Sequence, residues 1–341
     1  MKNIILIILL FSVIIKSDYS EHEMSEEVIF TLVKEHGFER DYVIEILKNA
    51  KKQQSIIDRI SKPAEFTITW DAYSNIFIEE KRIENGKKFI QDNLVTLEKA
   101  EKEFGVPKEI ITAILGIETR YGKIQGNDRV LDSLSTLGFD YPRRADFFRS
   151  ELIKFFILTR ENNLDIYSVK GSYAGAMGYG QFISSSYLAY AIDYDGDSYV
   201  DLFGSKKDAI GSIANYLSIH GWNADADIVL EIDHNNVRKP YNLDGKFIPI
   251  KLEEGKDIFY RVKNGDTLSE IALSNNISVK ELVKLNNIED KNILTTGKNI
   301  KINKKNNRYF IGTENFVAIT KYNYSHFYAM VVYNLARELG L

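Results

Sequence analysis

The spacing of apolar residues along the chain is the feature that most constrains how it can fold. From Ser25 to about Leu97 apolar residues recur three and four positions apart, beginning with Val28, Ile29, Leu32 and Val33. This is the period of an amphipathic α-helix. Gly105-Val106-Pro107 then interrupts the pattern and begins a new helix, because proline is favoured in a first helical turn. Helical patterns continue to His220, so we predict a mainly α-helical fold.

The pattern changes after Gly221-Trp222. Strand-like stretches follow at 228–232 and 247–252, and residues 260–302 form a compact unit of their own. The last thirty residues return to a helical pattern. We therefore expect a small β-containing subdomain and a separate small unit within the second half of the helical protein.

The N-terminus carries a short apolar segment. Lys2 precedes an almost unbroken apolar run at 4–15, which is too short to span a bilayer comfortably but suits a secretory signal. We predict a signal peptide at 1–20 and an exported protein of the periplasm or cell envelope. The alternative is an uncleaved segment that tethers the protein to the membrane. The chain has no cysteine, so it forms no disulfide and is not a lipoprotein.

The charge balance is close to neutral. The net charge is −4 and 44% of the residues are hydrophobic, which supports a packed core and gives no indication of a nucleic-acid partner. We expect a monomer.

Glu118 is the first candidate for chemistry. In the helix predicted over 107–121 it shares a face with Ile111 and Ile114, at spacings of three and four. A glutamate in line with isoleucines is partly desolvated, which raises its pKa, as a general acid for glycosidic cleavage requires. The alternative is a structural glutamate paired with Arg120 or Arg144.

Five blocks of sequence, in order, resemble the membrane-bound lytic transglycosylase B family, glycoside hydrolase family 103. They are G-V-P-K-E-I-I-T-A-I-L-G-I-E-T-R-Y-G (105–122), L-D-S-L-S-T-L-G-F-D-Y-P-R-R-A (131–145), K-G-S-Y-A-G-A-M-G-Y-G-Q-F (170–182), D-A-I-G-S-I-A-N-Y-L-S-I-H-G-W (208–222) and E-N-F-V-A-I-T-K-Y-N-Y-S-H-F-Y-A-M (314–330). The resemblance implies a lysozyme-like α-helical catalytic domain.

The family's chemistry places one carboxyl group at the centre of the reaction. The resemblance implies that Glu118 protonates the oxygen between N-acetylmuramic acid and N-acetylglucosamine. Its carboxylate then takes the proton of the muramyl C6 hydroxyl, which closes on C1 as a 1,6-anhydro product. No second acid is required, unlike the usual two-carboxylate scheme, and we interpret the nearby Asp140 as structural. The alternatives are a hydrolase of the same bond, or a non-catalytic wall-binding protein.

The resemblance also implies residues that line the glycan groove. Ser172 and Asn323 would bond the acetamido group near the reacting sugar, and Gln181 and Arg144 would add polar contacts. Flat aromatic faces and hydroxyl groups suit sugars, and would come from Tyr73, Tyr179, Tyr216, Tyr322 and Tyr328. The alternative for each tyrosine is core packing, and we expect it to hold for one or two of the five.

An acidic loop indicates a cation. Asp193, Asp195 and Asp197 stand at positions 1, 3 and 5 of an EF-hand-like pattern, with the carbonyl of Tyr199 at position 7. Position 6 is Ser198 rather than glycine, and Asp208 is the candidate closing ligand. The family carries a calcium site here, so we expect structural Ca²⁺ and no catalytic cofactor. The alternative is a solvated acidic turn.

Residues 260–302 resemble a LysM module, with the order strand, helix, helix, strand. The resemblance implies a shallow groove for N-acetylglucosamine-containing chains, formed by Gly265, Asp266, Thr267, Leu268, Asn286 and Ile288. Because the transglycosylase pattern resumes at Glu314, we interpret the module as inserted, which leaves the catalytic domain at 25–256 and 304–341. The alternative is a βααβ unit without a ligand. Peptidoglycan strands are the expected partner.

Overall fold

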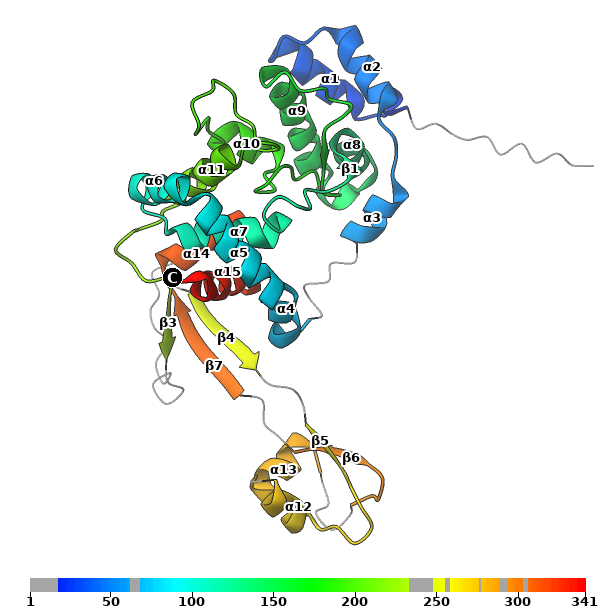
Figure 1. Ribbon diagram of the computed structural model, residues 1–341. Coiled ribbons are helices and arrows are strands. Elements are labelled where there is room, and N and C mark those ends of the chain that lie inside the picture. The colour runs from blue at the N-terminus through cyan, green and yellow to red at the C-terminus, as the bar shows by residue number, and fades with distance from the viewer. Residues whose placement is uncertain are drawn as a thin grey trace, which may run out of the picture. The chain divides into compact units, whose positions relative to one another are not determined.

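A computed structural model of the chain describes residues 18–61, 68–232, 248–254, 258–275, 277–288, 294–302 and 306–341. Figure 1 traces its helices and small sheets. The chain divides into two compact units that interleave in sequence. Unit 1 contains Met1–Pro63 and Ile114–Asn215, and unit 2 contains Ala64–Ala113 and Tyr216–Leu341. The prediction of a mainly α-helical fold with small sheets is confirmed.

Unit 1 is built around two helices that pack on each other, α8 (Val130–Asp140) and α9 (Ala145–Glu161). Nearly every side chain of α8 is buried, and α9 adds Phe148, Phe155 and Phe156 to the core. The other elements are η1 (Tyr19–Glu21), α1 (Ser25–Lys34), α2 (Arg40–Asn49), α3 (Gln54–Ile60), η3 (Pro142–Arg144) and α10 (Ser184–Tyr190). A two-stranded antiparallel ladder, β1 (Asp128–Arg129) with β2 (Lys170–Gly171), joins the ends of two loops.

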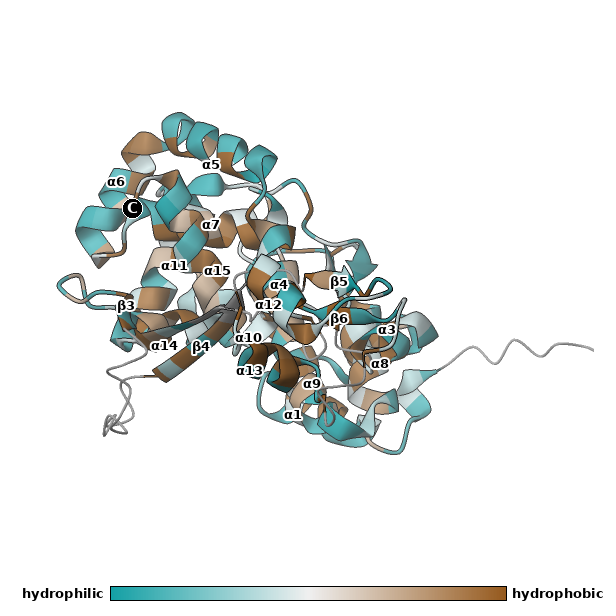
Figure 2. Cartoon of the chain, turned by 90° about the horizontal axis from the view of Figure 1, so that it is seen from below, coloured by the Kyte–Doolittle hydropathy of each residue, from teal (hydrophilic) through white to brown (hydrophobic). Residues whose placement is uncertain are grey.

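Unit 2 combines helices with a three-stranded antiparallel sheet. Its helices are α4 (Trp70–Phe77), α5 (Glu80–Asp92), α6 (Leu94–Phe104), α14 (Glu314–Tyr322) and α15 (His326–Leu339). The sheet has the order β3-β7-β4, from Val229–Ile232, Asn306–Gly312 and Ile248–Glu254. The buried α15 contacts α4, α5 and α14. By contrast α5 is mostly hydrophilic in Figure 2, since it buries Arg82, Gly86 and Phe89 alone.

Two helices contribute residues to both units. They are α7 (Lys108–Thr119) and α11 (Lys206–Ile219). Both fall in the sequence blocks that carry predicted catalytic and glycan-binding residues. Glu118 belongs to α7 and Tyr216 belongs to α11.

Residues 258–302 form the predicted order of elements, β5 (Phe259–Arg261), α12 (Leu268–Ser274), α13 (Val279–Leu285) and β6 (Asn299–Lys301). Each helix begins with a capping box, Thr267 with Glu270 and Ser278 with Glu281, which satisfies amides that a short helix leaves unpaired. A separate apolar cluster holds the unit together, made of Val262, Leu268, Ile271, Ala272, Leu282 and Ile300.

The predicted signal peptide lies mostly outside the described residues, which begin at 18. Within the described part of the chain, every helix is too short or too polar to cross a membrane.

Candidate active site

Glu118 lies in the last turn of α7, half-buried, while Ile111 and Ile114 on the same face are fully buried. The side chain of Glu118 is therefore partly exposed at the end of the helix, next to the apolar core. The following residues, Arg120 and Tyr121, have positive φ angles of 51° and 62°, so the chain turns sharply beyond the glutamate. This geometry presents a single carboxyl group at the boundary between apolar core and solvent.

The loop 171–182 is bonded to the end of this helix. Thr119 Oγ1 donates a hydrogen bond of 2.8 Å to the carbonyl of Tyr179, and accepts one of 2.9 Å from the amide of Gly122. Gly122 has φ +86°, and a Cβ there would stand 1.8 Å from Cε1 of Tyr179. Only glycine permits this approach. The ring of Tyr179 is thus held beside the turn that follows Glu118.

Gln181 and Ser172 are fixed by the same loop. Gln181 Nε2 donates to the carbonyls of Gln125 and Gly178, at 3.1 and 3.0 Å. Ser172 Oγ accepts from the amides of Ala174 and Ala176, at 3.3 and 3.1 Å. At Gly126, a Cβ would stand 2.1 Å from the carbonyl of Gly171, so the two loops meet backbone to backbone. The structure therefore gathers Ser172, Tyr179 and Gln181 around the turn after α7. Burial, and then the charge of Asp201, raise the pKa of Tyr179.

Arg144 lies at the end of η3, exposed to solvent. Its guanidinium stands over the rings of Phe147 and Phe148, at 4.3 and 5.3 Å from their centroids. Within the described chain Arg144 takes part in no ion pair, so the structure does not support Arg144 as the salt-bridge partner of Glu118.

The remaining predicted groove residues belong to unit 2. Tyr216 donates a 2.6 Å hydrogen bond to the carbonyl of Lys321, and its ring meets Tyr322 edge-on and stacks on His220. Asn323 is the C-cap residue of α14, and both it and Tyr322 are half-buried. In this cluster Tyr216 is buried, whereas Tyr322 and Asn323 keep part of their surface exposed.

Three of the five tyrosines are buried, one more than expected. Tyr328 is 2% exposed, Tyr216 is 7% exposed, and Tyr73 is 5% exposed with its ring against Phe77 and Phe327. Their burial favours the core-packing alternative over a wall of the groove for these three. The sequence does not distinguish them because a tyrosine on a helix serves either role.

The acidic loop has the donor set for a hard cation. One carboxylate oxygen from each of Asp193, Asp195 and Asp197 lies within 4.8 Å of the others. Asp193 also accepts the amides of Gly196, Asp197 and Ser198, which fixes a tight loop. Ser198 has φ +75°, the conformation that an EF-hand reserves for glycine at this position. Three converging carboxylates repel one another, and Ca²⁺ prefers such oxygen ligands, so the residues fit this ion.

Asp208, the predicted closing ligand, lies outside this cluster. It is fully buried, and its two oxygens accept the amides of Tyr194, Asp195 and Asp201 at 2.9, 3.2 and 2.8 Å. Burial raises the pKa of its carboxyl group. Asp208 thus stabilises the acidic loop by hydrogen bonds to backbone amides near both of its ends. Tyr199 is 62% exposed, and its amide donates to Asp197.

In the small βααβ unit, the structure alters the predicted glycan groove. Leu268 is buried in the unit's own core, and the amide of Asn286 is bonded to both backbone groups of Lys301. Asp266 accepts the amide of Lys263, and Thr267 caps α12. Ile288 packs against the core, and Gly265 has φ +89°. Leu268 therefore presents no surface to a ligand.

Thr119, Gly122 and Gln125 are residues that the prediction did not assign. Thr119 and Gly122 stand inside the matched block at 105–122, so their positions were visible, but their role depends on the loop at 171–182. No local signal in the sequence reveals that contact.

Comparison with known proteins defines the class. The transglycosylase SLT domain family matches residues 21–337 of this chain. The chain therefore belongs to this family, whose members include lytic murein transglycosylases. Membrane-bound lytic murein transglycosylase B of Escherichia coli (strain K12) is 33% identical over 333 residues, which is 95% of this chain and 84% of that protein.

Solved structures of relatives share the fold. Soluble lytic transglycosylase SltB1 of Pseudomonas aeruginosa is 35% identical with a TM-score of 0.68, covering 92% of this chain and 97% of that chain. Escherichia coli lytic transglycosylase Slt35, crystallised in complex with calcium, is 32% identical with a TM-score of 0.70, covering 95% of each chain. The fold is thus Slt35-like. Since the match runs through 260–302, the comparisons do not mark this unit as an inserted LysM module.

Proposed function

We propose that this protein is a peptidoglycan lytic transglycosylase that cleaves the β-1,4 bond between N-acetylmuramic acid and N-acetylglucosamine. Membership of the family supports the enzyme class. The observation that carries the residue assignment is the half-buried Glu118 at the end of α7, with the 171–182 loop bonded to the adjacent Thr119. A carboxyl group at the edge of an apolar core suits proton transfer in both directions.

The reaction needs one carboxyl group and no external water. Glu118 gives its proton to the bridging oxygen as the bond from that oxygen to muramyl C1 breaks. The carboxylate then takes the proton of the C6 hydroxyl, whose oxygen bonds to C1. Glu118 ends protonated, and the product is a 1,6-anhydro sugar. Ser172 and Asn323 would hold the acetamido group and Gln181 would add a polar contact, while Tyr179 and Tyr322 would face the sugar rings.

Substitution of Glu118 tests the assignment. With sacculi as substrate, Glu118→Gln should release soluble fragments about 10²–10⁴-fold more slowly, the range for loss of a general acid or base. Glu98→Gln on the exposed surface of α6 is the matched control and should retain full activity. Full activity in Glu118→Gln with an unchanged fold would overturn the assignment. Inactivity of the unaltered protein on sacculi would favour the non-catalytic alternative.

We also infer a structural Ca²⁺ in the acidic loop, held by Asp193, Asp195 and Asp197 with the backbone of Tyr199. The convergence of the three carboxylates and the calcium complex of Slt35 support this site. The ion would neutralise the loop and fix its backbone. No step of the reaction is assigned to it.

For residues 260–302 we propose a LysM-like role in holding N-acetylglucosamine-containing chains, through the Gly265–Thr267 turn and the loop at Asn286 and Ile288. The βααβ order and the unit's own apolar core support this proposal. Replacing 260–302 by a short glycine-serine linker should weaken sacculus binding while circular dichroism shows retained helix content. Unchanged sacculus binding in a folded variant would contradict it.

Location at the cell envelope follows from the proposed substrate. The relative from Escherichia coli is named as membrane-bound, and the apolar run at 4–15 predicts export of this chain.

A further inference from the structure

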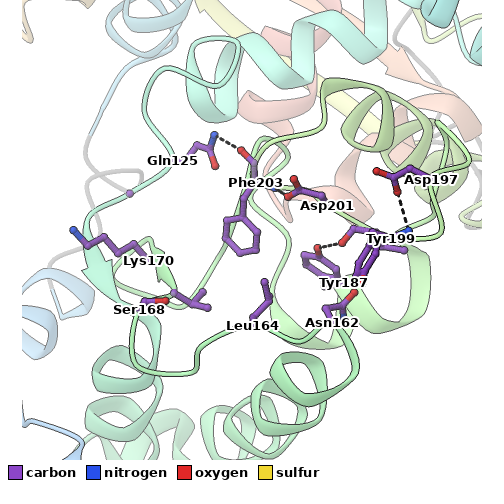
Figure 3. A pocket seen from close by; sticks show the side chains of 13 residues that line it. Gln125, Asn162, Leu164, Ser168, Lys170, Tyr187, Asp197, Tyr199, Asp201 and Phe203 are labelled. Carbon is purple, nitrogen blue, oxygen red and sulfur yellow. Dashed lines mark hydrogen bonds between the residues drawn. The ribbon is translucent and has the colours of Figure 1, made fainter.

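A cavity of about 610 Å³ lies within unit 1, and none of the residues assigned to the reacting sugar lines it, although Gln125 in its wall accepts a hydrogen bond from Gln181. We name it the Tyr199 pocket, and Gln125, Asn162, Leu164, Tyr199 and Phe203 are among the residues that line it. Its volume is that of a small-molecule site. Figure 3 shows the ring of Phe203 projecting between Gln125 on one side and Tyr199 with Asn162 on the other.

The lining supplies hydrogen-bonding groups that the described protein leaves unused. The side-chain nitrogen of Asn162 donates a hydrogen bond to the carbonyl of Leu158. The side-chain nitrogen of Gln125 donates to the carbonyls of Gly122 and Phe203. Among the described residues, the side-chain oxygens of both amides and the hydroxyl of Tyr199 have no partner. Two acceptors and one hydroxyl are therefore available to bind a ligand that carries both donors and acceptors.

The same pocket has apolar faces. The side chain of Tyr199 is 62% exposed, and Phe203 and Leu164 are half-buried. Flat apolar surface combined with amide and hydroxyl groups is what a sugar ring with an acetamido group requires.

The charge of the pocket selects among ligands. Asp201, which is not one of the three clustered aspartates, lines one side, and the ammonium of Lys170 points away from Phe203 in Figure 3. The carboxylate of Asp201 would repel an anionic ligand such as a phosphate, whereas it would not repel a neutral sugar.

The wall of the pocket is fixed before a ligand arrives. Buried Tyr187 donates a 2.7 Å hydrogen bond to the carbonyl of Val200 and accepts one of 3.2 Å from the amide of Leu202. The amide of Tyr199 donates to Asp197 at 2.8 Å. These hydrogen bonds fix the backbone from which the Tyr199 side chain projects, and preorganisation of this kind lowers the cost of binding.

From these observations we propose that the Tyr199 pocket is a second glycan subsite, which holds an N-acetylglucosamine residue of the strand at a distance from the reacting bond. The choice of N-acetylglucosamine among neutral sugars rests on the proposed function. Its role is to hold the polymer while the active site acts on another linkage.

The test uses the full chain carrying Glu118→Gln and tri-N-acetylchitotriose as the probe, followed by amide NMR. The expected result is a set of shifts at Asn162, Tyr199 and Phe203, distinct from those at 172–181. Shifts at 172–181 alone would overturn the second subsite. This readout needs no turnover, so it remains decisive if Glu118 proves not to be the catalytic acid.

Substitution provides a second arm. In the same background, Tyr199→Ala should weaken the pocket's affinity for the trisaccharide roughly three- to tenfold, as loss of one aromatic contact predicts. Tyr42→Ala, also a surface tyrosine of unit 1, is the matched control and should leave that affinity unchanged. Equal affinity in both variants would contradict the proposal.

Discussion

The hydroxyl of Tyr19 donates a 2.5 Å hydrogen bond to Oδ2 of Asp140, which stands 121 positions later in the chain. Lys52 binds the other oxygen of the same carboxylate at 2.5 Å, and the Tyr19 ring stacks on Phe139. Asp140 is thus engaged in the fold, in agreement with its interpretation as structural. Tyr19 is 3% exposed, so the folded unit begins before the end of the predicted signal peptide at residue 20.

This contact predicts where processing occurs. Removal of residues 1–17 should leave the folded protein intact, whereas removal of 1–20 should lower the free energy of unfolding by about 2–4 kcal/mol, as loss of a buried aromatic side chain does. Urea unfolding of the two truncated chains measures the difference. Intact mass of the exported protein should show Tyr19 retained. A mature chain beginning at Glu21 would contradict the prediction.

Tyr187 predicts a pH dependence. Burial raises the pKa of Tyr187 to about 12. Its hydroxyl is neutral and bonded in the folded state but ionises near pH 10 when unfolded. Its contribution is therefore complete below about pH 10 and is lost as pH rises toward 12. The free energy of unfolding, measured between pH 8 and 12, should fall less steeply with rising pH for Tyr187→Phe than for the unaltered protein. Parallel curves would contradict this account.

The acidic loop predicts stabilisation by Ca²⁺. Ligand present at a hundredfold excess over its Kd stabilises the folded state by about 2.7 kcal/mol, so the melting temperature should rise with added Ca²⁺ and fall again with a chelator. Asp195→Asn with Asp197→Asn should abolish the rise. Asp41→Asn, an exposed acid on α2, is the control and should keep it. Asp208→Asn should lower stability with or without Ca²⁺, because that carboxylate binds backbone amides.

Gly122 predicts a coupling between the turn after α7 and the 171–182 loop. In Gly122→Ala the new Cβ would collide with Tyr179 and occupy a left-handed conformation, at a cost of at least about 1–3 kcal/mol. The rate at which sacculi are cleaved should also fall, because the collision moves Tyr179 from its place beside the turn that follows Glu118. Gly37→Ala has a similar φ but open space around its Cβ, so it should cost stability without lowering the rate. Equal rates in the two variants would show that the contact does not position the loop.

The sequence predicted the elements better than the contacts between them. The strand-like stretches at 228–232 and 247–252 became β3 and β4, since their apolar residues already signal strands. The central strand β7 was not assigned, because its pairing depends on partners more than fifty positions away. Likewise the spacing of the aspartates predicted their convergence, but the role of Asp208 is decided by amides from three residues that only the fold brings to it.

The chemical outcome is the central claim, and mass spectrometry of the fragments released from purified sacculi tests it most directly. If the C6 hydroxyl displaces the bridging oxygen, every new muramyl end is a 1,6-anhydro sugar, lighter by one water than the hydrolysed form. Fragments with reducing muramyl ends, formed by the active protein and absent with Glu118→Gln, would contradict the account and identify a hydrolase.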